Sequence, residues 1–411
     1  MPSKPDGSGA GLAGRAGELA RSLARAPYIP SSAYRLQLNR RFTFARATEL
    51  LGYFADLGVD ALYCSPYFQA VPGSMHGYDC VDPTRLSADI GTEEEFASFC
   101  DGLKERGLGQ ILDIVPNHMG IAGNANAWWL DVLENGASSA FAHVFDIDWD
   151  PVKPELKNRV LLPVLGELYG KVLEAGEIAV RYEDGALFVR YWEHRFPADP
   201  RTYPLLFEER LDELQALLGS GDPVLGGFKE TLASLRELPA CDDTTPSRMT
   251  LRRRDKETAK LTLRDLTSRS PALRDWLVGV LAAPSLEALH RFLEAQPYRL
   301  AYWEAAADEI NHRRFFDINA LAAIRIEDER VFELHHELTF KLVREGRIQG
   351  LRIDHPDGLY DPTGYFGRLQ RRCLQELVIC GLGRGDGDAR AAAGEAAEAA
   401  LREADGAAAP F

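Results

Sequence analysis

Residues 109–118 read GQILDIVPNH and contain the strand that decides the fold class. The run from Gln110 to Val115 is almost entirely apolar, which is typical of a strand in a parallel sheet that is buried on both faces. Asp113 interrupts the run, and Asn117 and His118 follow it directly. Functional residues of parallel α/β proteins gather at the carboxyl ends of strands. The stretch therefore predicts a parallel sheet and a candidate site at its edge.

The residues before this strand alternate between strand and helix patterns. Apolar and polar residues alternate over 34–38, helical apolar spacing follows over 44–57, and a second apolar strand covers 59–63. Thr92 then caps a helix over 93–106, whose first turn holds three Glu residues that suit the helix dipole. The order strand, helix, strand, helix, strand is typical of a parallel α/β sheet or barrel.

The alternation stops after the third strand and resumes at residue 328. A helix over 328–345, a strand over 350–354 and a helix over 362–377 then continue it. We therefore expect residues 119–327 to form a large, mostly helical insertion after strand three. The predicted fold class is α/β, of the (β/α)8 TIM-barrel type, with only about the first four β/α units present.

The inserted region has its own predicted elements. Its pattern indicates a hairpin over 178–191 that turns at Asp184-Gly185, and helical apolar spacing recurs over 205–218, 263–281 and 286–310.

The chain divides into five predicted segments. We expect a mobile N-terminal tail over 1–32, the first part of a barrel over 33–118, the inserted domain over 119–327, the continued barrel over 328–380, and an Ala/Gly-rich tail over 381–411. The last segment has almost no large apolar side chain, so we expect a solvated helix or linker there rather than a core element.

Composition and charge exclude several classes of function. Hydrophobic residues make up 45% and charged residues 27% of the chain, which excludes wholesale disorder. Lys and Arg number 47 against 62 Asp and Glu, so the net charge is −15. This balance argues against nucleic acid as a partner, because phosphate binding needs clustered cations. The longest apolar run, 276–283, is too short to cross a bilayer, so we expect no membrane partner.

The six cysteines and the absence of metal motifs indicate a reduced protein without a cofactor. No CxxC pair, EF-hand loop or HExxH motif is present. We interpret the cysteines as mostly buried thiols of a cytoplasmic protein, and we expect neither a metal nor another cofactor. The first 30 residues lack the apolar segment of a signal peptide. Oligomeric state is left open.

Polar clusters follow the predicted strands. In the last of them, GLRIDHPDG at 350–358, Arg352 and Asp354 are two residues apart and point to the same side of the sheet. An Arg beside a carboxylate keeps it ionised, which a nucleophile that attacks a sugar carbon requires. The same pair can instead hold the sheet together. Similarly, Asn117 and His118 can serve chemistry or a turn, and Tyr78 can stack on a sugar or cover a loop.

Taken together, these clusters resemble the α-amylase clan, glycoside hydrolase family thirteen. In that family the third strand ends in D-x-x-x-N-H, which Asp113, Asn117 and His118 match here. The fourth strand carries G-x-R-x-D, which Gly350 to Asp354 match. The long insertion after strand three resembles the family's domain B.

A narrower resemblance, over residues 33 to about 371, is to the maltooligosyltrehalose synthases of that clan. Its stretches include SAYRLQLNRRFTF, PGSMHGYDCVDPTR, LDIVPNHM, FDIDWDP, RRFFDIN and GLRIDHPDGL. The resemblance implies a (1→4)-α-D-glucan 1-α-D-glucosylmutase, an isomerase of trehalose biosynthesis. Such an enzyme converts the reducing-end α-1,4 link of a maltooligosaccharide into an α,α-1,1 link by a retaining double displacement. The alternatives are an α-glucan hydrolase of the same clan and a non-catalytic glucan-binding relative.

The resemblance also implies roles for individual residues. Asp354 would be the nucleophile, Arg352 would hold it ionised and oriented, and Asp113 would partner that Arg. His118 and Tyr78 would contact the sugar at the cleaved position. The further substrate-binding candidates are His76, Asp79, Asn117, His355 and Asp357.

One expected residue has no match. A retaining enzyme needs a second carboxyl as general acid, which in this family is a Glu at the end of strand five. No strand-like run follows Leu377, and Glu395, Glu398 and Glu403 lie in Ala-rich, helix-like sequence. We therefore expect a fragment that is inactive alone, or a half-barrel that a partner completes.

Overall fold

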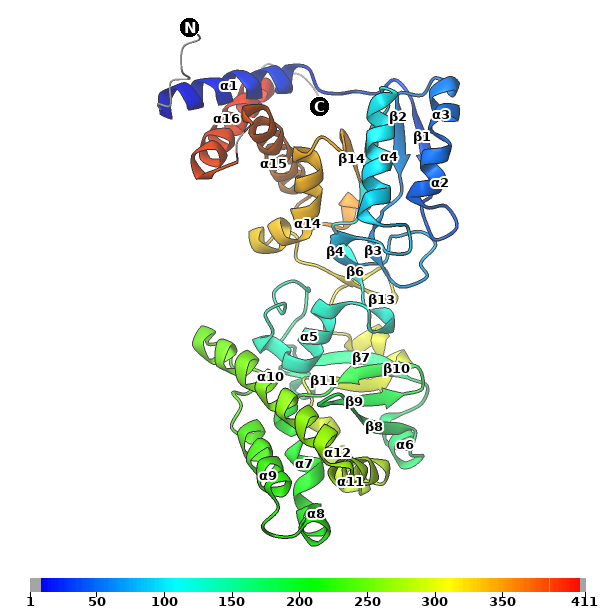
Figure 1. Cartoon of the computed structure of the whole chain (residues 1–411), viewed down its shortest axis with the longest axis vertical. Coiled ribbons are helices and arrows are strands. Elements are labelled where there is room, and N and C mark those ends of the chain that lie inside the picture. Colours follow the sequence, from blue (N-terminus) through cyan, green and yellow to red (C-terminus); the bar gives the residue numbers. More distant parts are fainter. Residues whose placement is uncertain (1–8, 384, 407–411) are drawn as a thin grey trace. The chain divides into compact units, whose positions relative to one another are not determined.

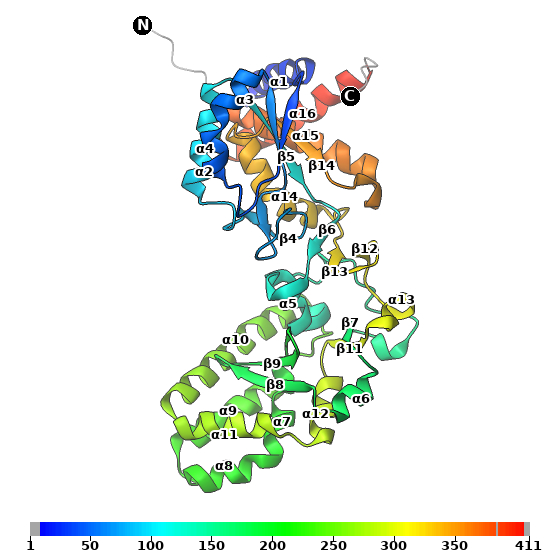
Figure 2. The same ribbon diagram turned by 90° about the vertical axis from the view of Figure 1, so that its right-hand side faces the viewer.

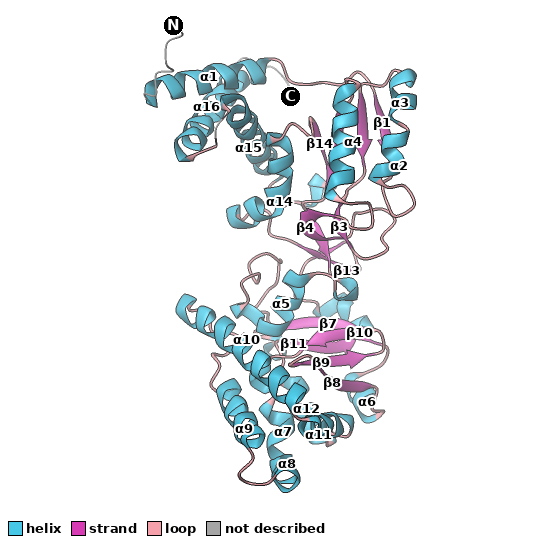
Figure 3. Cartoon of the chain, in the orientation of Figure 1, coloured by secondary structure: helices cyan, strands magenta, loops and turns pink. Residues whose placement is uncertain are grey.

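The computed structural model describes residues 9–383 and 385–406. The chain divides into two compact units, each a mixture of helices and strands (Figures 1 and 3). Unit 1 contains the residues up to Gly120 together with those from Ile324 onward, and unit 2 contains Ile121–Ala323. In sequence, unit 2 therefore separates two parts of unit 1.

A parallel sheet forms the centre of unit 1 (Figure 2). Within the described residues its strands are, in spatial order, β1 (Ala33–Leu36), β2 (Ala61–Cys64), β5 (Gly109–Ile114) and β14 (Gly350–Ile353). All three neighbouring pairs run parallel. The strands that the sequence predicts are thus confirmed, with small shifts at their ends.

Helices connect and cover these strands. They are α2 (Phe44–Glu49), α3 (Leu51–Leu57), α4 (Glu93–Glu105), α14 (Glu329–Arg344) and α15 (Pro362–Leu382). Each buries apolar side chains on one side, as amphipathic helices against a sheet do. The predicted helices at 93–106, 328–345 and 362–377 are confirmed.

Two details at helix ends show how the sequence sets the boundaries. Thr92 and Glu95 form a capping box at the start of α4, in which each side chain accepts the other's backbone N–H. The helix predicted over 44–57 is instead two helices, because the Leu50 N–H bonds to the Ala47 carbonyl and closes α2 there. Gly58 ends α3 in the left-handed conformation, which glycine adopts readily.

A short antiparallel pair and a further strand lie next to the sheet's carboxyl edge. β3 (Phe68–Ala70) pairs with β4 (Cys80–Leu86), and the loop between them carries the predicted site residues 74–79. β6 (His118–Gly120) follows β5 directly.

The two terminal segments differ from what the sequence predicts. A helix, α1 (Gly9–Arg25), stands where a mobile tail is expected, while residues 1–8 lie outside the described residues. The Ala-rich segment forms α16 (Gly387–Gly406), which packs against α1 and α15. Their contact buries Ala16, Ala20 and several alanines of α16. Small side chains let helices approach closely, so an Ala-rich helix does contribute to a core here.

Unit 2 contains small sheets. β8 (Ile178–Glu183), β9 (Ala186–Tyr191) and β10 (His194–Pro197) form an antiparallel sheet, which confirms the predicted hairpin. β7 (Val160–Leu165) pairs parallel with β11 (Tyr298–Tyr302). The remaining strands, β12 (Arg314–Phe315) and β13 (Ile318–Ala323), pair antiparallel.

Helices surround these sheets. They are α5 (Ala127–Asn135), α6 (Tyr169–Glu174), α7 (Pro204–Phe207), α8 (Leu211–Leu218), α9 (Pro223–Arg236), α10 (Pro246–Arg269), α11 (Pro271–Ala282), α12 (Leu286–Glu294) and α13 (Ala306–Glu309). The helix predicted over 263–281 breaks at Ser270, because the following proline begins α11. The helix predicted over 286–310 is wrong beyond Glu294, because β11 follows there.

A buried cation anchors α10 to the rest of unit 2. The Arg252 side chain is 1% exposed, and its guanidinium donates hydrogen bonds to Asp199 Oδ1 at 2.6 Å and to the Pro239 carbonyl at 2.6 Å. One turn further along α10, Lys256 forms an ion pair with the buried Glu134 of α5. These charges are paired as burial demands.

In the described part of the chain, no helix is both long and apolar enough to span a bilayer. All six cysteines are free thiols, of which Cys64, Cys80 and Cys100 are buried.

Candidate active site

The register of the parallel sheet brings four polar side chains to one face. Arg352 on β14 is the neighbour of Asp113 on β5, and Arg35 on β1 is the neighbour of Tyr63 on β2. Tyr63 in turn neighbours Ile111, which shares a face with Asp113 because the two lie two residues apart. Arg35, Tyr63, Asp113 and Arg352 therefore point to the same side of the sheet.

Asp113 is the most enclosed carboxylate of this cluster, with a side chain that is 0% exposed. Its Oδ2 accepts hydrogen bonds from the hydroxyls of Tyr63 at 2.6 Å and Tyr78 at 2.7 Å. Arg352 Nη1 donates to Oδ1 at 2.9 Å and to Oδ2 at 3.1 Å. These donors satisfy the buried carboxylate in its anionic form.

The same Arg352 nitrogen also donates to Asp354 Oδ1 at 2.5 Å. Asp354 is 6% exposed and follows β14, and its backbone N–H donates to the Ile114 carbonyl at the end of β5. Burial alone would lower the pKa of Arg352, but its hydrogen bonds to Asp113 and Asp354 outweigh burial and raise it. Arg352 is therefore a permanent cation shared between two carboxylates.

The two phenols of the cluster are permanent donors. Burial, and then the hydrogen bond to Asp113, raises the pKa of Tyr63 and likewise that of Tyr78 above the ordinary value for tyrosine. Both hydroxyls consequently keep their protons across the physiological range. The Tyr78 hydroxyl also accepts a hydrogen bond from Arg35 Nη2 at 3.3 Å.

The loop that carries Tyr78 is held in shape by its own side chains. Ser74 Oγ donates to Asp79 Oδ1 at 2.5 Å, and the Tyr78 N–H donates to His76 Nδ1 at 3.1 Å. The His76 and Tyr78 rings stack with centroids 6.1 Å apart. His76 and Asp79 thus shape the loop around Tyr78.

Gly77 lets this loop approach the sheet closely. Its φ is +79°, and a Cβ there would lie 2.2 Å from the Pro66 carbonyl oxygen, so a larger residue does not fit. From the other side, the Gln37 amide donates to the Met75 and His76 carbonyls, each at 3.2 Å. The loop is therefore fixed between the ends of β1 and β2.

His118 lies beneath Tyr78. It is 1% exposed, and its Nε2 is 3.1 Å from the Tyr78 carbonyl oxygen, to which a protonated Nε2 donates. Burial, which the hydrogen bond to Tyr78 offsets only in part, lowers the pKa of His118 to about 4. The imidazole is consequently neutral at pH 7, and it orients the loop without adding a charge.

The remaining predicted residues range from the buried Asn117 to the exposed Asp357. The Asn117 side chain borders Gly358, because a Cβ on that glycine would lie 3.1 Å from the Asn117 amide group. His355 has φ of +44°, an uncommon conformation for a residue with a side chain. Asp357 is 85% exposed, with His355 Nδ1 3.9 Å away, so it is not brought into the cluster.

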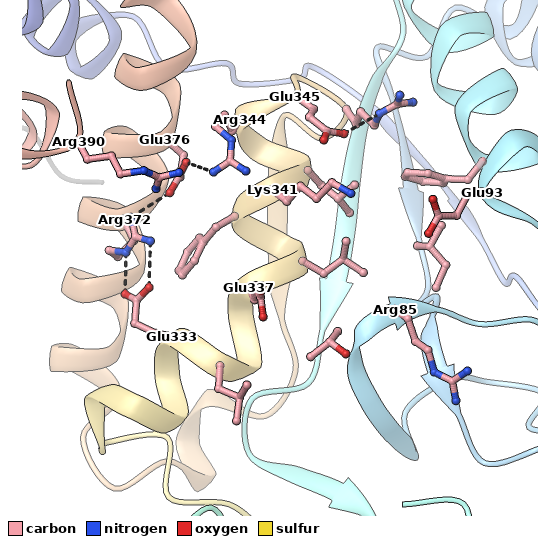
Figure 4. Close-up of a pocket in the computed structure, with 18 residues that line it drawn as sticks. Arg85, Glu93, Glu333, Glu337, Lys341, Arg344, Glu345, Arg372, Glu376 and Arg390 are labelled. Carbon is pink, nitrogen blue, oxygen red and sulfur yellow. Dashed lines mark hydrogen bonds and ion pairs between the residues drawn. The ribbon is translucent and has the colours of Figure 1, made fainter. Parts of the chain in front are cut away.

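A cavity elsewhere in unit 1 is not this site. It has a volume of about 1000 Å³ and lies along α14, between α4 and β4 on one side and α15 on the other (Figure 4). Ion pairs occupy much of its wall, including those of Arg372 with Glu333 and Glu376. None of the site residues predicted from sequence lines it.

Among the described residues, no three His, Cys, Asp or Glu side chains come together as metal ligands. The donors around Asp113 are phenols and a guanidinium, which compete with a metal ion for the carboxylate.

Sequence reasoning missed two members of the cluster, Tyr63 and Arg35. Both lie within predicted strands. Strand alternation together with the register places them on the face of Asp113, but the register comes from the structure. Arg35 lies in the quoted stretch SAYRLQLNRRFTF, but the resemblance assigned no role to it or to Tyr63.

The parallel sheet and the cluster around Asp113 are typical of the α-amylase clan. Comparison with known families supports the same class. A family model described as the α-amylase catalytic domain matches residues 44–154. An intracellular maltogenic amylase of Bacillus subtilis is 36% identical over 109 residues, which are 26% of this chain and 18% of that protein. The chain therefore has an α-amylase-type fold, and the resemblance to that clan is confirmed.

Other relatives match over more of the chain, and their names describe a more specific enzyme. A maltooligosyl trehalose synthase of Mycobacterium tuberculosis is 33% identical over 346 residues, covering 82% of this chain and 32% of that protein. The solved structure of maltooligosyltrehalose synthase from Arthrobacter ramosus matches with a TM-score of 0.57 and 32% identity, over 84% of this chain and 34% of that one. The chain is a homologue of these synthases and spans about a third of their length.

Proposed function

We propose that this chain carries the nucleophile side of an active site that rearranges maltooligosaccharides, as a (1→4)-α-D-glucan 1-α-D-glucosylmutase. The observation that carries the proposal is the chain of contacts from Asp113 through Arg352 to Asp354 at the carboxyl edge of a parallel sheet. Homology to maltooligosyl trehalose synthases over most of the chain supports the reaction type.

The proposal includes a finer description of the fold. The sheet β1-β2-β5-β14 is the first half of a (β/α)8 barrel, and unit 2 is the domain inserted after the third strand. The parallel strand order supports this, as does the position of unit 2 in the sequence between β6 and α14.

The chemistry begins at Asp354. Its carboxylate attacks the anomeric carbon of the terminal α-1,4 link, a C–O bond to the enzyme forms, and the bond to O4 of the reducing-end glucose breaks. The departing O4 takes a proton. The released glucose then turns and attacks the same carbon with its anomeric hydroxyl, whose proton passes to the group that protonated O4. The bond to Asp354 breaks as the α,α-1,1 link forms. Two displacements at one carbon retain its configuration.

The surrounding residues bind and orient. Arg352 holds the Asp354 carboxylate in position through a hydrogen bond, and Asp113 fixes Arg352. Tyr78 lies against the sugar ring, His118 supports Tyr78 from below, and the remaining candidates lie farther out. These are His76, Asp79, Asn117, His355 and Asp357, which shape the loops around the substrate.

The proton for O4 does not come from Asp113. Both of its oxygens already accept hydrogen bonds, from two phenols and a guanidinium, so neither is directed at the leaving O4. The acid is therefore a group outside this cluster. This supports the expectation that the 411 residues alone do not turn over a maltooligosaccharide.

The proposed setting of the reaction is the cytoplasm, with an α-1,4-glucan as the binding partner. Six free thiols support a reducing compartment. The net charge of −15 does not favour nucleic acid as a partner and is compatible with a neutral sugar.

A substrate whose leaving group needs no proton tests the proposal. Maltosyl α-fluoride presents the same anomeric carbon, and its fluoride departs with the C–F bonding electrons as the bond to Asp354 forms. We expect about one equivalent of fluoride per chain in a rapid burst, followed by slow turnover, because the second step still lacks a base. An ion-selective electrode measures this release.

Asp354→Asn is the matched variant, since it keeps the shape and removes the nucleophile. It should abolish the burst, while Asp275→Asn, at a 73% exposed carboxylate on α11 of unit 2, should retain it. A burst of the same size from Asp354→Asn would contradict the proposed role, as would the absence of a burst from the native chain.

A further inference from the structure

Tyr63 occupies a position in the cluster that no sequence motif assigns. It lies on β2, between Arg35 on β1 and the residues of β5, and its hydroxyl donates to Asp113 Oδ2 at 2.6 Å. Because β2 is an inner strand of the sheet, the phenol comes from a rigid element. Tyr78, the other phenol on Asp113, comes from a loop.

The Tyr63 hydroxyl matters because two carboxylates accept hydrogen bonds from the same Arg352. A single nitrogen, Nη1, donates to Asp113 at 2.9 Å and to Asp354 at 2.5 Å, so the two carboxylates compete for one donor. Each further donor on Asp113 disperses its negative charge and weakens its hold on that nitrogen. Tyr63 therefore affects Asp354 without touching it.

Arg35 fixes the phenols from the opposite side. Its guanidinium carbon lies 5.5 Å from the centre of the Tyr63 ring, and its Nη2 donates to the Tyr78 hydroxyl at 3.3 Å. Hydrogen bonds thus run from Arg35 to the Tyr78 hydroxyl and from that hydroxyl to Asp113, which also accepts from Arg352. Such a chain polarises each of its members.

We propose that Tyr63 is a positioning residue for the nucleophile: its hydrogen bond to Asp113 leaves Arg352 available to hold the Asp354 carboxylate in place. This inference rests on the proposed function. It predicts that one hydroxyl affects the pH profile of a reaction at a carboxylate that it does not contact.

The test compares Tyr63→Phe with Tyr67→Phe. Tyr67 is a buried tyrosine on the loop that follows β2, and its hydroxyl has no hydrogen-bond partner among the described residues. Both variants lose one hydroxyl and keep the ring. The rate of the fluoride burst from maltosyl α-fluoride is measured between pH 4 and 9, and the affinity for maltose is measured by calorimetry.

For Tyr63→Phe we expect the acid limb of the rate profile to move up by about one pH unit and the rate below the limb to fall about tenfold, because Asp113 then draws Arg352 away from Asp354. At high pH the rate recovers, and the affinity for maltose is unchanged. Tyr67→Phe should reproduce the native profile.

Each outcome has one meaning. If the native chain gives no burst, the proposed function fails. If the native chain gives a burst and both variants share its profile, the role of Tyr63 is wrong. A fall in rate at every pH without a shift of the limb also refutes it, because that is the effect of a merely structural residue.

A second variant guards against misfolding of the first. Arg35 is exposed, so Arg35→Gln should fold normally, which thermal melting by circular dichroism checks. It removes the cation that orients both phenols, and we expect a smaller shift of the acid limb in the same direction. An unshifted limb in this variant contradicts the proposed chain of contacts.

Discussion

The core of unit 1 contains a histidine that should make the fold sensitive to acid. His336 of α14 is 0% exposed, with Nδ1 2.8 Å from the Phe332 carbonyl and Nε2 2.9 Å from the Tyr365 hydroxyl. A carbonyl only accepts, so Nδ1 carries the proton and Nε2 accepts from Tyr365. This neutral ring satisfies both of its neighbours.

The sign of the effect follows from the pKa. Burial lowers the pKa of His336 to about 4, against 6.5 for an unperturbed histidine. Between these values the unfolded chain binds a proton that the folded chain does not, so stability falls as the pH drops from 6.5 towards 4. The full loss is about 3 kcal/mol, and about 2 kcal/mol of it falls between pH 7 and pH 5.

The matched perturbation is the double variant His336→Phe with Tyr365→Phe. It removes the titrating ring together with the hydroxyl that would otherwise be left buried and unpaired, so the free energy of unfolding at pH 7 should change little. Between pH 7 and pH 5 the variant should lose about 2 kcal/mol less stability than the native chain. His118, whose pKa burial also lowers, remains in both proteins and cancels in the comparison. The pKa of His335 is lowered by burial and also by His336, so the variant changes it in part.

The assay is urea unfolding followed by two probes. All six tryptophans lie between residues 128 and 303, so tryptophan emission reports unit 2, whereas far-UV circular dichroism reports both units. The transition seen by dichroism and not by emission belongs to unit 1. An equal loss of stability in the native and double-variant chains between pH 7 and pH 5 would refute the reasoning.

Three further predictions concern the loop at Gly77, the buried ion pair of Arg252 and the products of the native chain. Gly77→Ala should reduce the fluoride burst at least about tenfold, because its φ is +79° and its Cβ would meet the Pro66 carbonyl; an unchanged burst would contradict the loop geometry. Arg252→Met should destabilise unit 2 by about 3–5 kcal/mol in urea unfolding followed by tryptophan emission, because it leaves Asp199 buried without its cation, and a loss below about 1 kcal/mol would show the pair to be dispensable. The native chain should form no trehalose-terminated product from maltohexaose by chromatography; such a product would mean that an acid is present in the site after all.

The sequence predicts the regular elements of unit 1 well because each has a strong local pattern. The apolar run of β5 and the capping residue of α4 are visible without tertiary information. The prediction fails where tertiary packing decides. Residues 298–302 have helical apolar spacing, yet they form β11 because β7 supplies a partner strand.

The helix α1 and the burial of α16 were missed for a similar reason. An Ala-rich segment such as α16 has no large apolar side chain, so its pattern does not indicate a core. Its burial comes from close contact with α1, which lies at the other end of the sequence. Patterns within one segment cannot show such a contact.

Some residues of the candidate site could be predicted from the sequence, and others could not. Asp113, Arg352 and Asp354 lie in motifs and at strand ends, and the structure brings them together. Tyr63 and Arg35 lie within strands whose register the sequence does not give, so their approach to Asp113 was not predictable. Asp357 follows its motif in sequence but is largely exposed.

The central claim, that Asp354 is the nucleophile, is tested most directly by trapping. A maltosyl α-fluoride with a second fluorine at C5 of the reacting ring forms a glycosyl-enzyme that is slow to react further, and digestion with mass spectrometry locates the sugar. We predict one label per chain, on the peptide that contains Asp354 and on its carboxylate. A label on Asp113 or on another carboxylate, or a native chain that remains unlabelled, would contradict the account.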